Sequence, residues 1–248
     1  MKTVGILGGL GPLAGAHFYK RIVEMTPASD DHEHIPIVLI SDPSIPSRIR
    51  HLEGTGESPV PKLLDVSNKL LSLGADLIAI PSSTTNIYYS ELVKLAKIPI
   101  ISMIEEVTNE ISKSSLRRIG ILATTPTRSY QVYEKHFSQA GIHAIYPDDS
   151  SQIEVMNIIA RVKGNNRGRN KVEVEGTLDD SLLTVSDQIY ELACRQWSDS
   201  IDGLLLACTE IPVIFPSQKW ASNGRTLPKL FSSTDILAVA VVREAYGY

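Results

Sequence analysis

Short apolar runs rich in β-branched residues alternate with longer amphipathic stretches along this 248-residue chain. Such alternation is typical of βαβ units, in which helices cover both faces of a parallel sheet, so it predicts an α/β fold. The predicted strands are Thr3–Leu7, Pro36–Ile40, Asp76–Ile80, Ile98–Ile101, Arg118–Leu122, Ile142–Ile145, Gly203–Leu206 and Pro228–Phe231. The clearest helix is Pro61–Leu73, which is followed by Gly74. Its apolar residues, expected close to one face, are Leu63, Leu64, Val66, Leu70, Leu71 and Leu73.

Three strand-forming segments recur in the same order in the second half of the chain. The matches are Val4–Leu7 with Ile119–Leu122 at an offset of 115 residues, Ala75–Ser82 with Ile201–Cys208 at 126, and Ile98–Ile101 with Leu227–Leu230 at 129. Such fragments also recur by composition in parallel-sheet proteins, but their order favours two related halves. We expect residues 1–100 with a C-terminal helix at about 235–248 to form one half, and residues 101–234 the other. A ligand would bind between the halves, at the carboxyl ends of the strands.

The charge balance points to a small ligand. Lys and Arg number 24 against 28 Asp and Glu, a net charge of −4, so the chain lacks the positive field that nucleic acid or an anionic membrane requires. No apolar run approaches the roughly 20 residues that span a bilayer, and the N-terminus lacks a signal-peptide cleavage pattern. We expect a cytoplasmic protein in which Cys194 and Cys208 are free thiols, with no metal site.

Cys208 follows a predicted buried strand and begins the sequence Cys208-Thr209-Glu210-Ile211-Pro212. Main-chain N–H groups and the positive end of the following helix would lower its pKa and make thiolate available. Free cysteine is also a common core residue, and that alternative stays open. Cys194 lies within an apolar helical pattern, where we expect it only to pack.

The equivalent turn of the first half, Pro81–Asn86, places Ser82 at the position of Cys208. Its hydroxyl and N–H groups would cap a helix, or would bind a carboxylate if they face an open cleft. Two opposed groups, Ser82 and Cys208, would then face one ligand. Arg48 follows a proline-rich segment and offers a guanidinium for a ligand carboxylate, although a surface position is the default for arginine.

Glycines follow the first predicted strand in Gly8-Gly9-Leu10-Gly11-Pro12-Leu13-Ala14, which contains the loose dinucleotide pattern G-x-G-x-x-A. That fingerprint requires an acidic residue roughly 20 positions later, whereas Asp42 comes 31 positions after Gly11. The glycines suit equally a backbone that approaches a small acid closely. We therefore predict no nucleotide cofactor.

Five motifs stand in order along the chain: Gly5–Pro12, Ile45–Arg48, Pro81–Thr84, Leu122–Thr124 and Ala207–Pro212. Together they resemble the aspartate/glutamate racemase family, the cofactor-independent amino-acid racemases, over essentially the whole chain. The resemblance implies two similar α/β domains, a homodimer, an acidic amino-acid substrate and no cofactor. It also implies that Cys208 is a catalytic base and that Arg48 and Lys163 recognise the substrate's carboxylates. The other implied substrate-binding residues are Leu10, Ser83, Thr84, Thr124, Thr209 and Glu210.

The chain departs from the family pattern at the first catalytic cysteine. Where these racemases usually have Cys-Asn-Thr-Ala-His, it has Ser82-Ser83-Thr84-Thr85-Asn86, and Leu10 replaces a common methionine. A serine hydroxyl titrates far above a thiol and is a poor base, although Ser82 can donate a proton or orient a water.

This substitution predicts a biased racemase. In the family the second-half cysteine takes the proton from the L enantiomer, so we expect the L side to be favoured and Cys208 to be the principal acid and base. Two alternatives stay open: a single-thiol decarboxylase or isomerase of a related dicarboxylate, and a non-catalytic carboxylate-binding protein.

Overall fold

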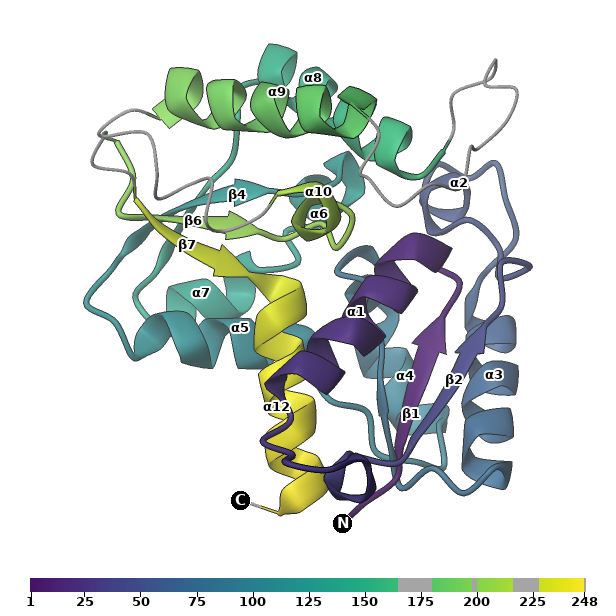
Figure 1. The fold of residues 1–248 in the computed structure, drawn as a ribbon. Coiled ribbons are helices and arrows are strands. Elements are labelled where there is room, and N and C mark those ends of the chain that lie inside the picture. Colours follow the sequence, from purple (N-terminus) through teal and green to yellow (C-terminus); the bar gives the residue numbers. More distant parts are fainter. Residues whose placement is uncertain (165–179, 198–199, 216–227, 248) are drawn as a thin grey trace.

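Two parallel β-sheets, each flanked by helices, make up the protein (Figure 1). The structure is a computed structural model, and it describes residues 1–164, 180–197, 200–215 and 228–247. The strands of the first sheet are β1 (Val4–Gly8), β2 (Ile37–Ser41) and β3 (Leu77–Ala79), and those of the second are β4 (Arg118–Leu122), β5 (His143–Ile145), β6 (Gly203–Leu206) and β7 (Lys229–Ser232). The predicted fold, two parallel-sheet α/β halves, is confirmed.

The two sheets share one strand order and one register. The first has the order β2-β1-β3 and the second β5-β4-β6-β7. Val4 of β1 pairs with Leu77 of β3, and Ile119 of β4 pairs with Gly203 of β6. The sequence matches align Val4 with Ile119 and Leu77 with Gly203, so the two strand pairs are equivalent. The internal repeat therefore reflects a repeated structure.

The predicted strand Ile98–Ile101 is reduced to a single parallel bridge between Ile78 and Ile100 beside β3. Pro99 has no N–H to donate, which limits the pairing. The N–H of Ile78 donates to the Pro99 carbonyl over 2.8 Å, and the N–H of Ile101 donates to the Ile78 carbonyl over 2.9 Å. The bridge occupies the place in the first sheet that β7 occupies in the second.

Helices fill the connections between strands. They are α1 (Pro12–Met25), α2 (Arg48–Leu52), α3 (Val60–Ser72), α4 (Tyr89–Leu95), α5 (Met103–Ser112), α6 (Thr125–Ser129), α7 (Glu134–Gln139), α8 (Asp149–Val162), α9 (Asp180–Trp197), α10 (Ile211–Ile214) and α12 (Ser233–Tyr246), with 3₁₀ helices η1 (Asp31–Glu33) and η2 (Thr84–Tyr88). Helix α3 matches the predicted helix within one residue, and it buries Leu63, Val66 and Leu70. Leu71 and Leu73 are exposed, against expectation. Leu71 lies about 100° around the helix from Leu70, and Leu73 is the C-terminal cap.

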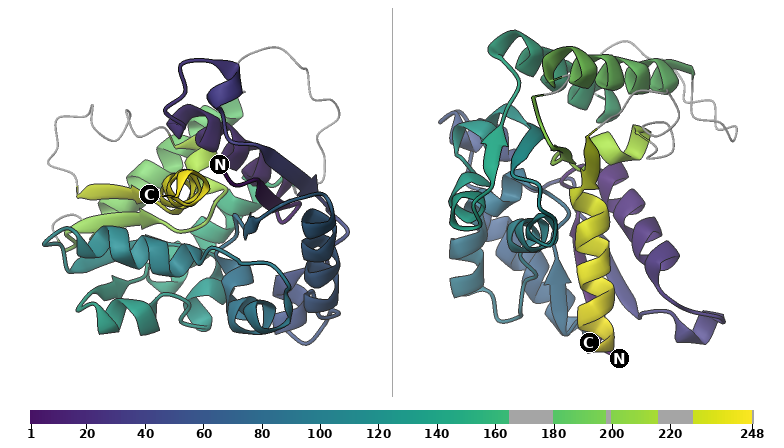
Figure 2. Two further views of the ribbon diagram at one scale, coloured as in Figure 1. Left: turned by 90° about the horizontal axis from the view of Figure 1, so that it is seen from below. Right: turned by 90° about the vertical axis from the view of Figure 1, so that its left-hand side faces the viewer.

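One apolar core joins the two sheets. It contains residues of β1 and β4 together with the buried faces of α1, α5 and α12. Helix α12 lies beside α1 and also packs on α5 (Figure 2). The proposed division, residues 1–100 with 235–248 against 101–234, thus separates two sheets that share a continuous hydrophobic cluster. Burial of these shared side chains stabilises the relative placement of the sheets.

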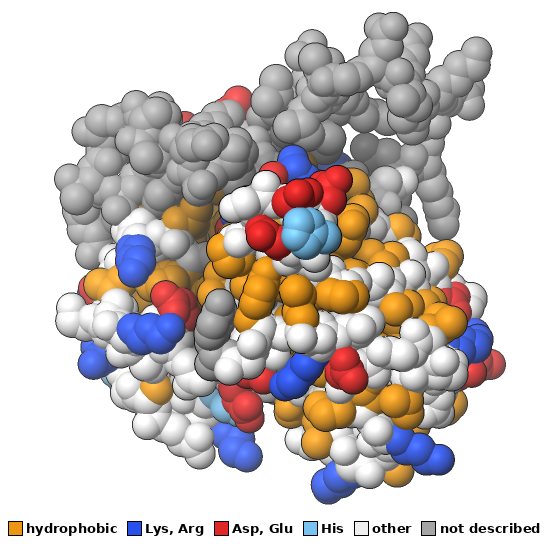
Figure 3. Space-filling view, turned by 60° about the horizontal axis from the view of Figure 1, so that its bottom comes forward, with side chains coloured by type: hydrophobic (Ala, Val, Ile, Leu, Met, Phe, Trp, Pro, Cys, Tyr) orange, Lys and Arg blue, Asp and Glu red, His pale blue; other side chains and the backbone are white. Residues whose placement is uncertain are grey.

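The surface carries charges of both signs. On the face shown in Figure 3, Lys and Arg side chains are scattered among Asp and Glu and form no continuous basic patch. Among the described residues, no helix has the length and apolar character needed to cross a membrane.

The loop after β1 depends on a glycine. Gly9 has a φ of 88°, and a Cβ at this position would collide with the main chain of Asp42 in the loop after β2. Glycine adopts positive φ readily and has no side chain to clash. It therefore allows the loops after β1 and β2 to lie against each other at the carboxyl edge of the first sheet.

We expect Gly9→Ala to destabilise the fold more than Gly74→Ala. Both glycines have positive φ, 88° and 89°, so alanine costs about 1–2 kcal/mol of backbone strain at either position. A Cβ at Gly74 meets open space, whereas one at Gly9 meets Asp42, which adds about 1–3 kcal/mol of overpacking. Urea unfolding of both variants measures the difference. Equal losses would show that the loop after β2 simply moves away.

Candidate active site

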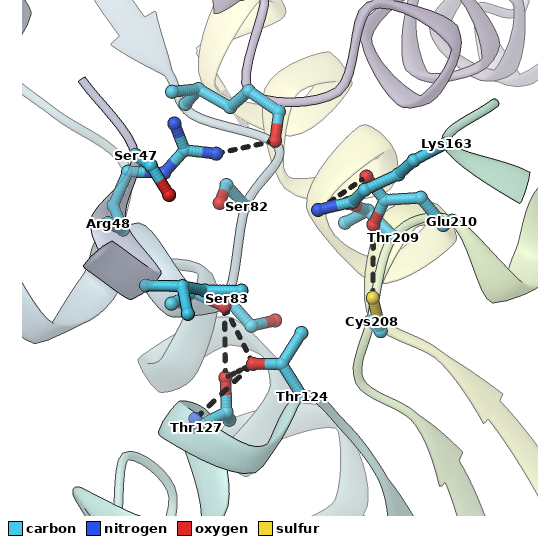
Figure 4. A pocket seen from close by; sticks show the side chains of 13 residues that line it. Ser47, Arg48, Ser82, Ser83, Thr124, Thr127, Lys163, Cys208, Thr209 and Glu210 are labelled. Carbon is cyan, nitrogen blue, oxygen red and sulfur yellow. Dashed lines mark hydrogen bonds and ion pairs between the residues drawn. The ribbon is translucent and has the colours of Figure 1, made fainter. Parts of the chain in front are cut away.

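A pocket of about 180 Å³ lies between the halves, lined by the loops after β1, β3, β4 and β6, by α2 and its N-cap, and by the residue after α8 (Figure 4). It is smaller than the roughly 300–1,000 Å³ of pockets for drug-sized ligands, which favours a compact substrate. The structure brings all ten predicted site residues to this pocket: Leu10, Arg48, Ser82, Ser83, Thr84, Thr124, Lys163, Cys208, Thr209 and Glu210. Ser47, Ile49 and Thr127 complete the lining. Thr127 belongs to the segment Thr124–Thr127 that follows the predicted strand Arg118–Leu122, whereas no motif singled out in the sequence points to Ile49.

Two reciprocal hydrogen bonds tie the loop after β3 to the loop after β6. The Ser83 hydroxyl donates to the carbonyl oxygen of Ala207, and the Thr209 hydroxyl donates to the carbonyl oxygen of Pro81 over 3.1 Å. Ser83 is equivalent to Thr209 in the internal repeat, and Pro81 to Ala207. Each half therefore makes the same contact with the other. These side chains hold the loops together, which leaves the main-chain N–H groups of Ser83 and Thr209 for a ligand.

Ser82 and Cys208, the two predicted catalytic residues, each precede one of these hydroxyl side chains. Ser82 is 7% exposed and Cys208 5%. The Thr85 hydroxyl donates to Ser82 Oγ over 2.8 Å, and the hydrogen of the Ser82 hydroxyl has no acceptor among the described residues. Cys208 Sγ donates to Glu210 Oε2 over 3.0 Å. Ser82 thus has a proton free to donate, whereas the Cys208 proton is directed at a carboxylate.

The Cys208 thiol is less acidic than the sequence indicates. Burial raises the pKa of Cys208 well above its ordinary value, and the negative charge of Glu210 raises it further, while the positive charge of Lys163 acts in the opposite direction. Helix α10 has only four residues, so it supplies little helix dipole. The predicted lowering of the pKa is wrong, because burial and the charge of Glu210 raise this pKa instead, which favours the neutral thiol.

Glu210 is a buried carboxylate, 3% exposed. Lys163, the C-cap of α8, places Nζ 3.3 Å from Glu210 Oε1. The same oxygen packs against the main chain of Gly11, where any Cβ would collide with it. Gly11 therefore makes room for the Glu210 carboxylate. This packing explains the second glycine of the G-x-G-x-x-A pattern without a dinucleotide phosphate.

Arg48 is a partly buried cation that lines the pocket, and no described residue gives it a carboxylate partner. Its guanidinium donates to the carbonyl oxygen of Leu10 over 2.7 Å and to that of Pro46 over 3.4 Å. In the part of the chain that the structure describes, no carboxylate lies within ion-pair distance of it. Burial lowers the pKa of Arg48, but the ordinary pKa of a guanidinium lies so far above neutral pH that the group stays charged. Its remaining N–H groups are available to an anion.

The charged side chains that described residues contribute to the lining are two cations and one anion, namely Arg48, Lys163 and Glu210. Within the described ranges, no three His, Cys, Asp or Glu side chains are grouped so that they could hold a metal ion. The excess positive charge therefore favours an anionic ligand over a cation.

Three threonine hydroxyls form a triangle at one side of the pocket. Thr84 from the first half lies 2.9 Å from Thr124 and 3.2 Å from Thr127 of the second half, and Thr124 and Thr127 are 2.9 Å apart. A hydroxyl has one hydrogen, can rotate, and can both donate and accept. A ligand carboxylate can therefore replace one of these mutual contacts without leaving a hydroxyl unpaired.

Comparison with known proteins places these residues in context. The sequence model described as Asp/Glu/Hydantoin racemase matches residues 7–240. The broad specificity amino-acid racemase RacX of Bacillus subtilis (strain 168) is 26% identical over 215 residues, which cover 85% of this chain and 91% of that protein. The structure of Picrophilus torridus aspartate racemase superimposes with a TM-score of 0.81 at 29% identity, over 99% of this chain and 95% of that one. Francisella tularensis glutamate racemase has the same fold, with a TM-score of 0.63 at 17% identity over 99% and 81%.

Glu210→Gln and Lys163→Met should move the pKa of Cys208 in opposite directions. The first removes the negative charge that raises this pKa, so the thiol should react faster with iodoacetamide at pH 8. The second removes the positive charge that lowers it, so the reaction should be slower. Alkylation rates against pH, with peptide mapping to separate Cys208 from Cys194, measure both. Shifts of the same sign would mean that burial alone controls the thiol.

Proposed function

Because the chain belongs to the Asp/Glu/Hydantoin racemase family, we propose that it removes and returns the Cα proton of aspartate or glutamate without a cofactor. The chain is an isomerase of the racemase class. The proposal has three further parts: the substrate is acidic, the L enantiomer is preferred and a single thiol acts as the base.

The proposal of an acidic substrate rests on the placement of two cations in a small pocket. Arg48 comes from the first half and Lys163 from the second, and both line the pocket that holds Cys208. An acidic amino acid brings two carboxylates, one for each cation. Arg48 has no competing carboxylate within the described residues, and a planar guanidinium pairs with a carboxylate through two parallel hydrogen bonds. Lys163 already contacts Glu210, so it serves both the substrate and the thiol's partner.

Proton removal begins with Cys208 and Glu210. The thiol proton moves to Glu210 Oε2, 3.0 Å away, and leaves a thiolate. The thiolate takes the Cα proton, and the electron pair of the broken C–H bond spreads into the substrate's α-carboxylate. A proton from Ser82, or from a water that it orients, then arrives on the opposite face, and the proton that Glu210 holds returns through solvent to the oxyanion left there. Both directions of the conversion pass through these same steps, so the poor base at Ser82 slows them equally. The bias lies in exchange of the Cα proton, which Cys208 alone supports on the L face.

Main-chain N–H groups can stabilise the charge that develops on the α-carboxylate. In the described residues, the N–H groups of Ser83, Thr84 and Thr209 donate to no carbonyl or side chain. They stand at the two loops that the reciprocal hydrogen bonds hold together, and the hydroxyls of Thr84 and Thr124 lie beside them. Fixed donors of this kind stabilise a developing oxyanion by several kcal/mol.

A second candidate function follows from the raised pKa of Cys208. A neutral thiol is ready to donate a proton, which is the step that completes decarboxylation of a dicarboxylate through an enediolate. One thiol is enough for this reaction, because only one face of the carbon needs a proton. Release of carbon dioxide from a dicarboxylate, followed by NMR, distinguishes it from exchange at Cα.

The proposal predicts faster deuterium exchange at Cα for L-aspartate or L-glutamate than for the D enantiomers. In D₂O the hydrogen that Cys208 takes from Cα exchanges with solvent deuterium, and the thiol then returns deuterium to the same face. Proton NMR follows the loss of the Cα signal for each enantiomer. Cys208→Ala should abolish exchange on the L side. No exchange with any of the four amino acids would eliminate racemisation as the function.

Ser82→Cys should add proton removal from the D enantiomer. The change replaces one oxygen by sulfur, fits the site with little repacking, and brings the side-chain pKa toward the usable range. Ser67→Cys is the matched control, because Ser67 is a buried serine of α3 that does not line the pocket. If Ser82→Cys folds and binds ligand without any gain on the D side, Ser82 is not the counterpart of a second base.

A further inference from the structure

Tyr133 is a fully buried tyrosine whose hydroxyl meets the loop after β3. It is the N-cap of α7, and its ring packs on Phe137 with the ring centroids 5.4 Å apart. It does not line the pocket. Its hydroxyl oxygen lies 3.0 Å from Ser83 Oγ, which belongs to the other half. Burying a hydroxyl is costly unless it is hydrogen-bonded, so the contact with Ser83 compensates for the burial of Tyr133.

The hydrogen bond between Tyr133 and Ser83 has a fixed direction. A hydroxyl has one hydrogen, and that of Ser83 is donated to the carbonyl oxygen of Ala207. The sulfur of Met103 lies 3.3 Å from Ser83 Oγ, but a thioether is only a weak acceptor. Tyr133 therefore donates to Ser83. Burial raises the pKa of the Tyr133 hydroxyl above its ordinary value, so this group stays neutral and keeps its hydrogen.

The result is a directed chain of hydrogen bonds from Tyr133 through Ser83 to Ala207, in which each bond strengthens the next. Ala207 directly precedes Cys208, and the N–H groups of both residues donate to the Leu122 carbonyl, over 2.9 and 3.1 Å. Those two bonds hold the loop after β6 to its own half, and the bond from Ser83 holds it to the other half. The chain thus ends on the main chain that carries the thiol.

The reciprocal bond from Thr209 to the Pro81 carbonyl has no such support. Among the described residues, no side chain donates to the Thr209 hydroxyl. The residue 115 positions before Tyr133, at the offset that aligns β1 with β4, is Phe18, which is also buried. A phenyl ring fills space and donates nothing. The bond that ends on the loop after β6 is therefore backed by a buried hydroxyl, whereas the bond that ends on the loop after β3 is not.

We propose that Tyr133 is a positioning residue for proton transfer at Cys208. By donating to Ser83, it directs the Ser83 hydrogen to Ala207 and so fixes where the thiol lies relative to the substrate's Cα. Tyr133 acts through this chain, since it does not line the pocket. The assignment rests on the proposed function for the reaction that Cys208 performs.

Tyr133→Phe tests the proposal, because it removes the hydroxyl and keeps the ring. Amide hydrogen exchange in residues 207–212, measured without ligand, should become about two- to tenfold faster, the range that one net hydrogen bond gives. The kcat for Cα-proton exchange of L-aspartate should fall about tenfold, with KM within about twofold of the original. A misplaced reacting group slows the chemical step, whereas the contacts to the substrate's carboxylates remain.

Ser83→Ala tests the route, because it removes the middle of the chain and keeps the main-chain N–H. If Tyr133 acts through Ser83, adding Tyr133→Phe to Ser83→Ala should change kcat and hydrogen exchange by less than about twofold. Full additivity of the two substitutions would show that Tyr133 acts by another route and would overturn the proposal.

Tyr146→Phe is the matched control, because Tyr146 packs against the same core, has a buried hydroxyl oxygen and does not line the pocket. It should leave kcat, KM and hydrogen exchange in residues 207–212 unchanged. Unchanged hydrogen exchange in Tyr133→Phe overturns the proposal, and so does faster exchange at unchanged kcat, which would make Tyr133 purely structural. Absence of Cα-proton exchange in the unaltered protein overturns the proposed function instead, while hydrogen exchange in the single and double variants still decides whether Tyr133 holds the loop through Ser83.

Discussion

The pair of hydrogen bonds between the loops after β3 and β6 is the constraint on which the pocket depends. Ser83 and Thr209 reach across to carbonyl oxygens of the opposite half, in surroundings where an unpaired buried carbonyl would cost about 1–3 kcal/mol. The shared hydrophobic core stabilises the packing of the sheets, but it does not specify which loop residues face each other. These two bonds do so, and they place Ser82 and Cys208 on opposing loops.

Contacts in the pocket link Lys163 to Glu210 and Glu210 to Cys208. Lys163 lies against Glu210, which accepts a hydrogen bond from Cys208, while the hydrogen-bond partners of Arg48 among the described residues are carbonyl oxygens. This arrangement favours a neutral thiol. A carboxylate that engaged Lys163 would change the charge around Glu210, and its binding would then be coupled to the protonation of Cys208.

The sequence predicts most of the fold because hydrophobic periodicity reports directly on strands and helices. The internal repeat also brings Ser82 opposite Cys208, since equivalent strand ends meet at one cleft. The pKa of Cys208 could not be predicted, because it depends on burial and on where the Glu210 carboxylate lies. That carboxylate fits against Gly11 only because glycine has no Cβ. Ile49 could not be predicted as a site residue for a related reason. It lies in a short helix whose placement comes from tertiary contacts.

The reciprocal bonds relate the two halves as identical subunits of a symmetric dimer are related, yet both halves belong to one chain. In a dimer of identical subunits, any substitution appears on both sides of the shared site at once. Covalent linkage removes that restriction. Residue 82 can be serine while residue 208 stays cysteine, and the loops keep the same mutual hydrogen bonds. A fused pair can therefore keep a symmetric framework while each face of the substrate meets different chemistry.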